Sequence, residues 1–289
     1  MKRARLSRRM TTPTREITMP ADTLFADELI GPGRGLAHGA RLLHPFLHVP
    51  ISGGAAIWDA LRVTYAALDH EVVADVRFAG QTTSAVAWRG RCDGRPIRGL
   101  TMALLGETGE VVELRVLLCE FAVALPWRAR LRERLPGLPG WELTPEEASA
   151  IVARVTDPSW QADTVAPFEL SEQIRFFAPA FSRPIEGPAQ VGLIIRNAVA
   201  VYGVCESGEL LRAPAHVLRA KRSTLPMAIA TILHVLPDGR ADEVWVFMQA
   251  WPVISVFRQC LRARLADALD ASFYELSGVD DQRARQERV

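Results

Sequence analysis

The stretch Gly99 to Leu135, GLTMALLGETGEVVELRVLLCEFAVALPWRARLRERL, returns in recognisable form at Ile229 to Leu265, IATILHVLPDGRADEVWVFMQAWPVISVFRQCLRARL. Each version reads as an apolar strand, a tight turn, a second apolar strand and an amphipathic helix rich in arginine. Self-similarity over this length predicts two copies of one domain rather than a solenoid, whose repeats are shorter. Aligning the turn glycines pairs residues of like character, namely Gly109 with Gly239, Glu113 with Glu243, Val116 with Val246, Arg128 with Arg258 and Leu131 with Leu261.

The similarity continues upstream of the repeated stretch. A helix is expected over Ala55 to Leu68, because its apolar residues fall on one helical face, and a copy of it over Gly187 to Tyr202. Three strands should follow each helix. In the first copy they are expected at Glu71 to Ala79, Thr83 to Cys92 and Pro96 to Leu105, and in the second at Glu209 to Val217, Leu218 to Ser223 and Pro226 to Val235.

Proline and glycine punctuation sets the expected domain boundaries. LPGLPG at 135 to 140 separates the copies, and Thr144 with Glu147 has the spacing of a capping box that begins a helix. We therefore expect a disordered basic leader over residues 1–20, a first domain over 21–136, a second over 137–275 and a charged tail over 276–289.

Composition excludes several classes of protein. The chain has 289 residues, of which 49% are hydrophobic and 23% charged, which is ordinary for globular domains. The net charge of +1 gives no reason to expect binding to nucleic acid or to an anionic membrane. No apolar run is long enough to span a bilayer. The four cysteines lack zinc-type spacing, so we expect reduced thiols in a cytoplasmic protein without a metal or cofactor.

The order of helix, bent apolar segment, helix and curved sheet resembles the NTF2-like superfamily, in particular the SnoaL-like polyketide cyclases, ketosteroid isomerases and limonene-epoxide-hydrolase-like proteins. The residues that carry the resemblance are PISGGAAIWDAL at 50–61 and GLTMALLGETGEVVELRV at 99–116, with IEGPAQVGLII at 185–195 and LHVLPDGRADEVWV at 233–246. The resemblance implies an α+β fold with two tandem cone-shaped barrels, each a curved antiparallel sheet with packed helices, forming an intramolecular pseudo-dimer. Two fused copies look most like the epoxide-opening cyclases of polyether biosynthesis.

The family's catalytic positions carry over only in part. The Asp base of ketosteroid isomerases falls on His44 in the first copy and on Ala178 in the second, so neither copy keeps that carboxylate. The oxyanion-side acid falls on Thr101 and Thr231, and a threonine is a far poorer acid than a carboxyl group in an apolar pocket. The classical isomerase reaction is therefore not expected.

The polyether cyclases imply a second carboxylate in the first long strand of each copy, which falls on Glu71 and Glu206. His44 and Glu71 would form an imidazole–carboxylate pair that moves protons, while Thr101 hydrogen-bonds a developing oxyanion. The expected catalytic residues are therefore His44, Glu71, Thr101 and Glu206. Asp69 is the substitute for Glu71 if the strand register differs by a step. The other expected substrate-binding residues are Trp88, Thr231, His216 and His234.

These residues support two hypotheses about function. One is a cofactor-independent cyclase or epoxide-opening enzyme that acts on a polyketide-type intermediate by general acid–base catalysis in an apolar pocket. The alternative is a non-catalytic protein that binds a hydrophobic ligand or serves as a scaffold, with degenerate active sites. In both, the expected partner is a small hydrophobic molecule, with no nucleic acid and no membrane, and the pseudo-dimer could further form a homodimer.

Overall fold

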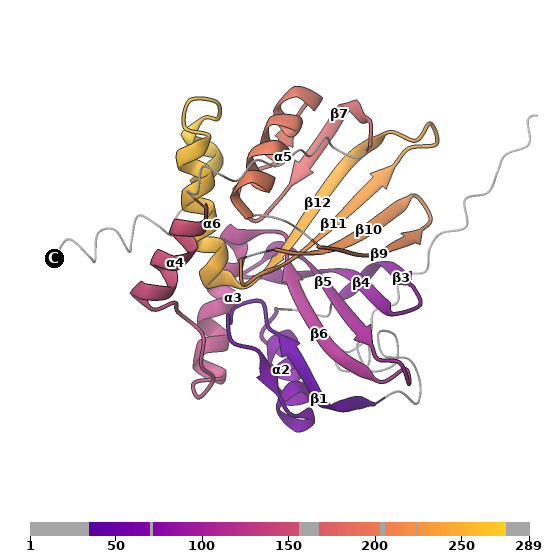
Figure 1. The fold of residues 1–289 in the computed structure, drawn as a ribbon, viewed down its shortest axis with the longest axis vertical. Coiled ribbons are helices and arrows are strands. Elements are labelled where there is room, and N and C mark those ends of the chain that lie inside the picture. Colours follow the sequence, from indigo (N-terminus) through magenta and orange to yellow (C-terminus); the bar gives the residue numbers. More distant parts are fainter. Residues whose placement is uncertain (1–34, 70–71, 156–167, 203–205, 224, 276–289) are drawn as a thin grey trace, which may run out of the picture.

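The computed structural model describes residues 35–69, 72–155, 168–202, 206–223 and 225–275. One order of elements occurs twice along these residues (Figure 1). The first series is β1 (Leu36–Leu43), β2 (Ile51–Ser52), α2 (Gly54–Ala66), β3 (Val73–Ala79), β4 (Thr83–Cys92), β5 (Arg95–Leu105), β6 (Val111–Leu118) and α3 (Phe121–Arg134). After α4 (Pro145–Val155), the second series is β7 (Leu170–Phe177), β8 (Ile185–Glu186), α5 (Pro188–Tyr202), β9 (Glu206–Ala213), β10 (His216–Arg222), β11 (Ala228–Val235), β12 (Ala241–Gln249) and α6 (Trp251–Arg264), followed by the short helix η1 (Ala271–Tyr274).

The described strands form one hydrogen-bonded sheet, whose main path runs β3-β4-β5-β6-β12-β11-β10-β9. Neighbours on this path are antiparallel, and β6 joins β12 where Leu118 lies opposite Met248. In Figure 1 the purple half, β3 to β6, and the orange half, β9 to β12, face each other, with α2 and α5 outside. The fold is therefore α+β, with a curved antiparallel sheet covered by helices.

In each series, one short strand runs parallel to the last long strand. Strand β1 pairs with β6 so that Arg41 lies opposite Glu113, and β7 pairs with β12 so that Arg175 lies opposite Glu243. An arginine–glutamate ion pair forms at both places. Pro45, which has no backbone N–H, follows β1 where the chain turns away from the sheet.

Two hydrophobic clusters lie on opposite faces of the sheet. One fills the space between its two halves, with Leu100 and Leu117 from the first series and Leu218, Ile232 and Phe247 from the second. The other, larger cluster lies on the helix side and continues through both series. Alternation along a strand sends successive side chains to the two clusters, so each strand residue has a fixed side.

The outer ends of the curved sheet are also connected. Glu209 on β9 accepts hydrogen bonds from the backbone N–H groups of Gln81 and Thr82, at 2.7 and 3.1 Å, in the turn between β3 and β4. A Cβ at Gly80 in that turn would lie 2.4 Å from the side chains of Glu209 and Leu211 on β9, so a larger residue there would require these side chains to shift.

Several local predictions are confirmed. The predicted helix at 55–68 is α2, with Ile57, Leu61 and Thr64 buried. Thr144 and Glu147 form the predicted capping box, with reciprocal hydrogen bonds of 2.8 and 3.2 Å. Within the described part of the chain, no helix is long and apolar enough to cross a membrane.

The strand boundaries predicted for the second copy are wrong by a few residues. The turn between β9 and β10 comes at Pro214 and Ala215, where Ala215 has a φ of 57°, and not at Val217. Proline cannot donate to a strand ladder, so it ends β9. The leader and the tail lie outside the described residues, and the predicted domain boundaries stay predictions.

Candidate functional site

Aromatic side chains fill the helix side of the first series. Trp88 is fully buried, and its indole Nε1–H donates to the Thr101 hydroxyl oxygen at 3.0 Å. The Tyr65 hydroxyl lies 2.6 Å from the same oxygen. Trp88 packs edge-on against both Tyr65 and Trp127, and Trp127 packs edge-on against Phe46. Thr101 is 1% exposed, and its hydroxyl group hydrogen-bonds only to side chains of this aromatic cluster among the described residues.

His44 belongs to the same packed core. Its Nε2 lies 2.9 Å from the Thr64 Oγ1, and its Nδ1 accepts from the Phe46 N–H at 3.3 Å. The Thr64 hydroxyl donates to the carbonyl oxygen of Ala60, so its oxygen accepts the proton on His44 Nε2. Complete burial lowers the pKa of His44 to about 3. His44 is therefore a neutral, hydrogen-bonded core residue in this structure.

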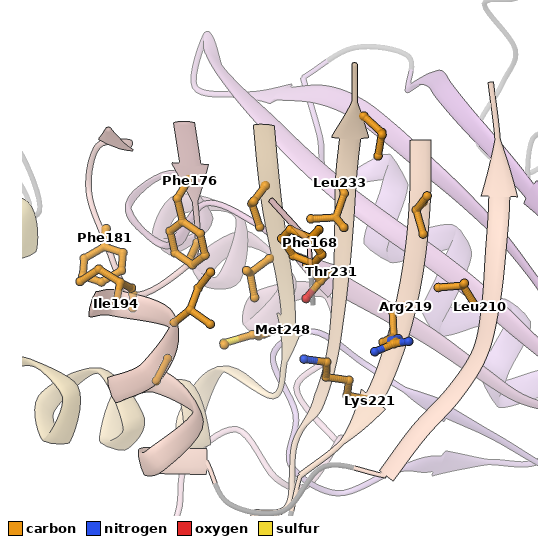
Figure 2. A pocket seen from close by; sticks show the side chains of 18 of the residues that line it. Phe168, Phe176, Phe181, Ile194, Leu210, Arg219, Lys221, Thr231, Leu233 and Met248 are labelled. Carbon is orange, nitrogen blue, oxygen red and sulfur yellow. The ribbon is translucent and has the colours of Figure 1, made fainter. Parts of the chain in front are cut away.

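A cavity of about 330 Å³ occupies the helix side of the second series (Figure 2). This volume is at the lower end of the roughly 300–1,000 Å³ that is usual for small-molecule sites. In Figure 2, Phe176, Phe181 and Ile194 gather on the helix side of the cavity, and Met248 and Leu233 reach it from the sheet. Most of the lining is apolar. The remaining lining residues are Phe168, Ala178, Ala180, Ile195, Ala198, Leu210, Arg212, Val217, Arg219, Lys221, Thr231, Val235, Gly239, Val244, Val246, Phe257 and Leu261.

The cavity exists because the second series has smaller side chains at positions that the first series fills. Residues 36–66 correspond to 170–200, since β1 and β7, and β2 and β8, differ by 134 in number. By this correspondence Ala178, Ala180 and Ala198 stand where the first series has His44, Phe46 and Thr64. All three alanines line the cavity.

A further exchange between the two series is at Trp88. Trp88 lies opposite Gly99 in the β4–β5 ladder, and Lys221 lies opposite Ile229 at the corresponding place in the β10–β11 ladder. A Cβ on Gly99 would lie 2.0 Å from the Trp88 ring, so the glycine makes room for the indole. Because residue 221 is a lysine and not a tryptophan, no indole ring fills the space beside Thr231.

The polar part of the cavity lies on β9, β10 and β11. Arg219 lies directly opposite Thr231, and Lys221 is two residues further along the same face of β10. Figure 2 shows Arg219, Lys221 and Thr231 reaching into the pocket. Among the described residues, the Thr231 hydroxyl has no hydrogen-bond partner, unlike that of Thr101. None of the described lining residues carries a carboxyl or imidazole group.

The structure separates the residues predicted to act together. His44, Thr101 and Trp88 lie in the filled core of the first series, whereas Thr231 lines the cavity of the second. Neither this cavity nor a smaller one of about 130 Å³ between the sheet halves is lined by His44 or Thr101. Glu71 lies outside the described residues, and Glu206 begins β9 with its side chain outside them.

Asp69, His216 and His234, which were also predicted to bind the ligand, are not among the residues that line the cavity. Asp69 lies before β3, where its carboxylate ion-pairs with Arg130 at 2.7 Å and accepts from the Gly94 N–H. These contacts, the Arg130 hydrogen bond first, lower the pKa of Asp69 to about 2. His216 and His234 lie opposite each other on β10 and β11 and alternate with the cavity residues, so they point to the other sheet face. Contrary to expectation, they therefore do not reach the cavity.

Sequence reasoning missed Arg219 and Lys221 as site residues. Ala178 was recognised only as a position without the family's catalytic Asp, and not as one of the three alanines that leave room for the cavity. The sequence did contain a signal for Lys221, because Lys2 and Lys221 are its only lysines and all its other basic side chains of this kind are arginines. The register that places Lys221 at the Trp88 position depends on the length of the β10–β11 turn, which periodicity does not give.

No family model matches the chain, and no curated protein matches it. Solved structures that resemble it include a steroid delta-isomerase from Pseudomonas aeruginosa, with 17% identity and a TM-score of 0.33, aligned over 35% of this chain and 74% of the isomerase. A protein assigned to the SnoaL-like polyketide cyclases from Jannaschia sp. CCS1 has 16% identity and a TM-score of 0.27, over 33% of this chain and 80% of that one. A designed NTF2-fold protein has 12% identity and a TM-score of 0.23, over 32% and 66%.

Proposed function

We propose that this protein binds a small, largely apolar molecule in the cavity of the second series. The observation that carries the proposal is the set of alanines, Ala178, Ala180 and Ala198, at positions that hold larger side chains in the first series. An unfilled apolar space forfeits packing and destabilises a protein unless something occupies it. The first series shows that the same arrangement of elements accommodates a filled core.

We further propose that the two series are tandem NTF2-like domains, 21–136 and 137–275, related as a pseudo-dimer. Leu118 and Met248, which pair where β6 meets β12, are corresponding residues separated by the 130 positions that relate β6 to β12. Pairing of one position with its own counterpart is what a two-fold axis produces. In this arrangement the first domain supports the second, and only the second domain holds a ligand.

Binding can be tested with the neutral fluorescent probe N-phenyl-1-naphthylamine. The wild-type protein should give saturable fluorescence. Ala180→Phe, which introduces the residue of the first series, should weaken probe binding by about tenfold or more, because the ring takes the ligand's space. Ala198→Leu fills the same space from α5 and is a second variant if Ala180→Phe folds poorly. Ala150→Phe, at an exposed position of α4, is the matched control. Equal affinity of both cavity variants and wild type would contradict the proposal.

Catalysis on a polyketide-type intermediate is the second candidate, as in a cyclase or an epoxide-opening enzyme. Its support is that Thr231, Arg219 and Lys221 face one cavity, where a hydroxyl group and two cations would stabilise a developing oxyanion. In this candidate the proton acceptor is Glu206, the carboxylate of the second copy that the resemblance to polyether cyclases implies. Turnover of an epoxy-alcohol that falls about 10²-fold in Glu206→Gln, the usual share of general base catalysis, would favour this candidate over simple binding.

A further inference from the structure

Three cationic side chains lie along one wall of the cavity. Arg212 comes from β9, and Arg219 and Lys221 come from β10. Arg212 lies opposite Val217 and Arg219 opposite Leu210, so the two arginines are diagonal neighbours on the same sheet face. Lys221 follows Arg219 on that face at a spacing of about 7 Å along the strand. Like charges this close repel one another unless an anion lies among them.

The two arginines of this wall face little negative charge from the described residues. No described carboxylate lies within ion-pairing distance of Arg212 or Arg219. Glu209, the acid nearest in sequence on β9, directs its carboxylate to the backbone of Gln81 and Thr82. The Glu209 carboxylate therefore connects β9 to the β3–β4 turn.

The fold itself does not require these cations. Val86 lies opposite Thr101 in the first series, as Arg219 lies opposite Thr231 in the second. Trp88 is at the position in the first series that corresponds to Lys221 in the second. The first series thus forms the same ladder with two apolar, buried side chains. In the second series, Arg219 and Lys221 are both partly exposed and line the same cavity as the aromatic rings.

We propose that the ligand is an amphipathic acid, whose apolar body lies among Phe176, Phe181 and Ile194 and whose carboxylate lies between Arg219 and Lys221. The Thr231 hydroxyl, opposite Arg219, donates a hydrogen bond to the same carboxylate. Hydrogen bonds to ionised groups are stronger than neutral ones and fix the orientation of the ligand. This inference rests on the proposed binding function and specifies the chemical class of its ligand.

The test compares decanoate with 1-decanol, which share an apolar chain and differ in the charged group. Both are titrated into the full-length protein at pH 7.5, below their aggregation concentrations, in competition with the neutral probe. Decanoate should bind about tenfold or more tightly than 1-decanol, as expected for hydrogen bonds to a charged group. Arg219→Met and Lys221→Met should each weaken decanoate binding more than 1-decanol binding, and so remove most of that preference. Arg95→Met, at the exposed first residue of β5, removes the same charge outside the cavity and should change neither affinity.

The outcomes separate the two proposals. If the wild type binds decanoate and 1-decanol with equal affinity, and Ala180→Phe weakens the binding of both, the proposal of an acidic ligand is wrong and the proposed binding function stands. If both methionine variants keep the full preference for decanoate, the ligand's carboxylate does not lie between Arg219 and Lys221, and the proposal is wrong. If neither compound displaces the probe, or if Ala180→Phe binds both normally, the proposed binding site itself is wrong.

Discussion

Trp88 and Lys221 occupy corresponding places in the two halves of the sheet, each opposite the residue that begins its version of the repeated stretch. The indole of Trp88 fills its half and donates to Thr101, whereas Lys221 lines a cavity together with Thr231. One exchange therefore changes both the volume and the charge of the space beside an otherwise equivalent threonine.

Trp88→Ala should destabilise the protein strongly. The substitution removes a fully buried ring that packs on Tyr65 and Trp127, and we expect the free energy of unfolding to fall by about 3–5 kcal/mol. Urea-induced unfolding measures this change. Trp58→Ala, at a position that is 37% exposed, is the control and should shift stability by no more than about 0.5 kcal/mol. A loss below about 1 kcal/mol for Trp88→Ala would mean that the first core is not tightly packed around this ring.

His44 should make the protein less stable in acid and not more. Its pKa is about 3 in the folded state, against an ordinary value of 6.5, because burial disfavours the charged imidazolium. The unfolded chain therefore binds a proton at His44 below pH 6.5 while the folded chain does not. The free energy of unfolding should fall as the pH decreases from 6.5 towards 3, by at most about 1.4 kcal/mol per pH unit from this group.

The contribution of His44 can be isolated with His44→Gln, whose amide offers a donor and an acceptor to Thr64 and Phe46. The variant lacks a titrating group, so its unfolding free energy should fall less between pH 6.5 and 4 than that of the wild type. Parallel pH curves for the two proteins would show that His44 titrates normally, and would reopen its role as a proton shuttle.

Glu113 should stabilise the fold through its ion pairs with Arg41 and Arg115. Its oxygens lie 2.6 Å from both guanidinium groups, and Glu113 and Arg115 are each 4% exposed, so their ion pair is buried. Burial alone raises the pKa of Glu113, but Arg115 and Arg41 outweigh it and bring that pKa below its ordinary value of 4.5. The stabilisation is therefore complete above pH 4.5 and is lost as the pH falls below it.

Glu113→Gln leaves two arginines without their carboxylate and should cost about 3–5 kcal/mol at pH 7. The gap between wild type and variant in urea unfolding should narrow below pH 4.5. Glu107→Gln, at an exposed position of the β5–β6 turn, is the control and should behave as wild type at every pH. A gap that stays constant down to pH 3 would assign the loss to packing and not to charge.

Much of the fold follows from patterns along the chain. The helix around Ile57 and Leu61 and the capping box of Thr144 and Glu147 each depend on residues close in sequence, and both were predicted. The candidate site was predicted less well. Thr231, which was expected to bind substrate, lines the cavity. His216 and His234 were expected to reach it too, because their strand faces were not known, but they lie on the other face of the sheet. A shift of one residue in register moves every side chain to the other sheet face.

One pattern of strand, turn, strand and helix can be recognised twice from the sequence alone, because the spacing of glycines and apolar residues recurs at a constant offset from Gly109 to Leu135 and from Gly239 to Leu265. Which of the two series holds the cavity could not be predicted from the sequence. That depends on whether side chains distant in sequence, such as Phe46, Trp88 and Trp127, meet in one volume, and on whether the alanines and Lys221 that replace some of them leave that volume open. Packing is a property of neighbours in space, and no local pattern encodes it.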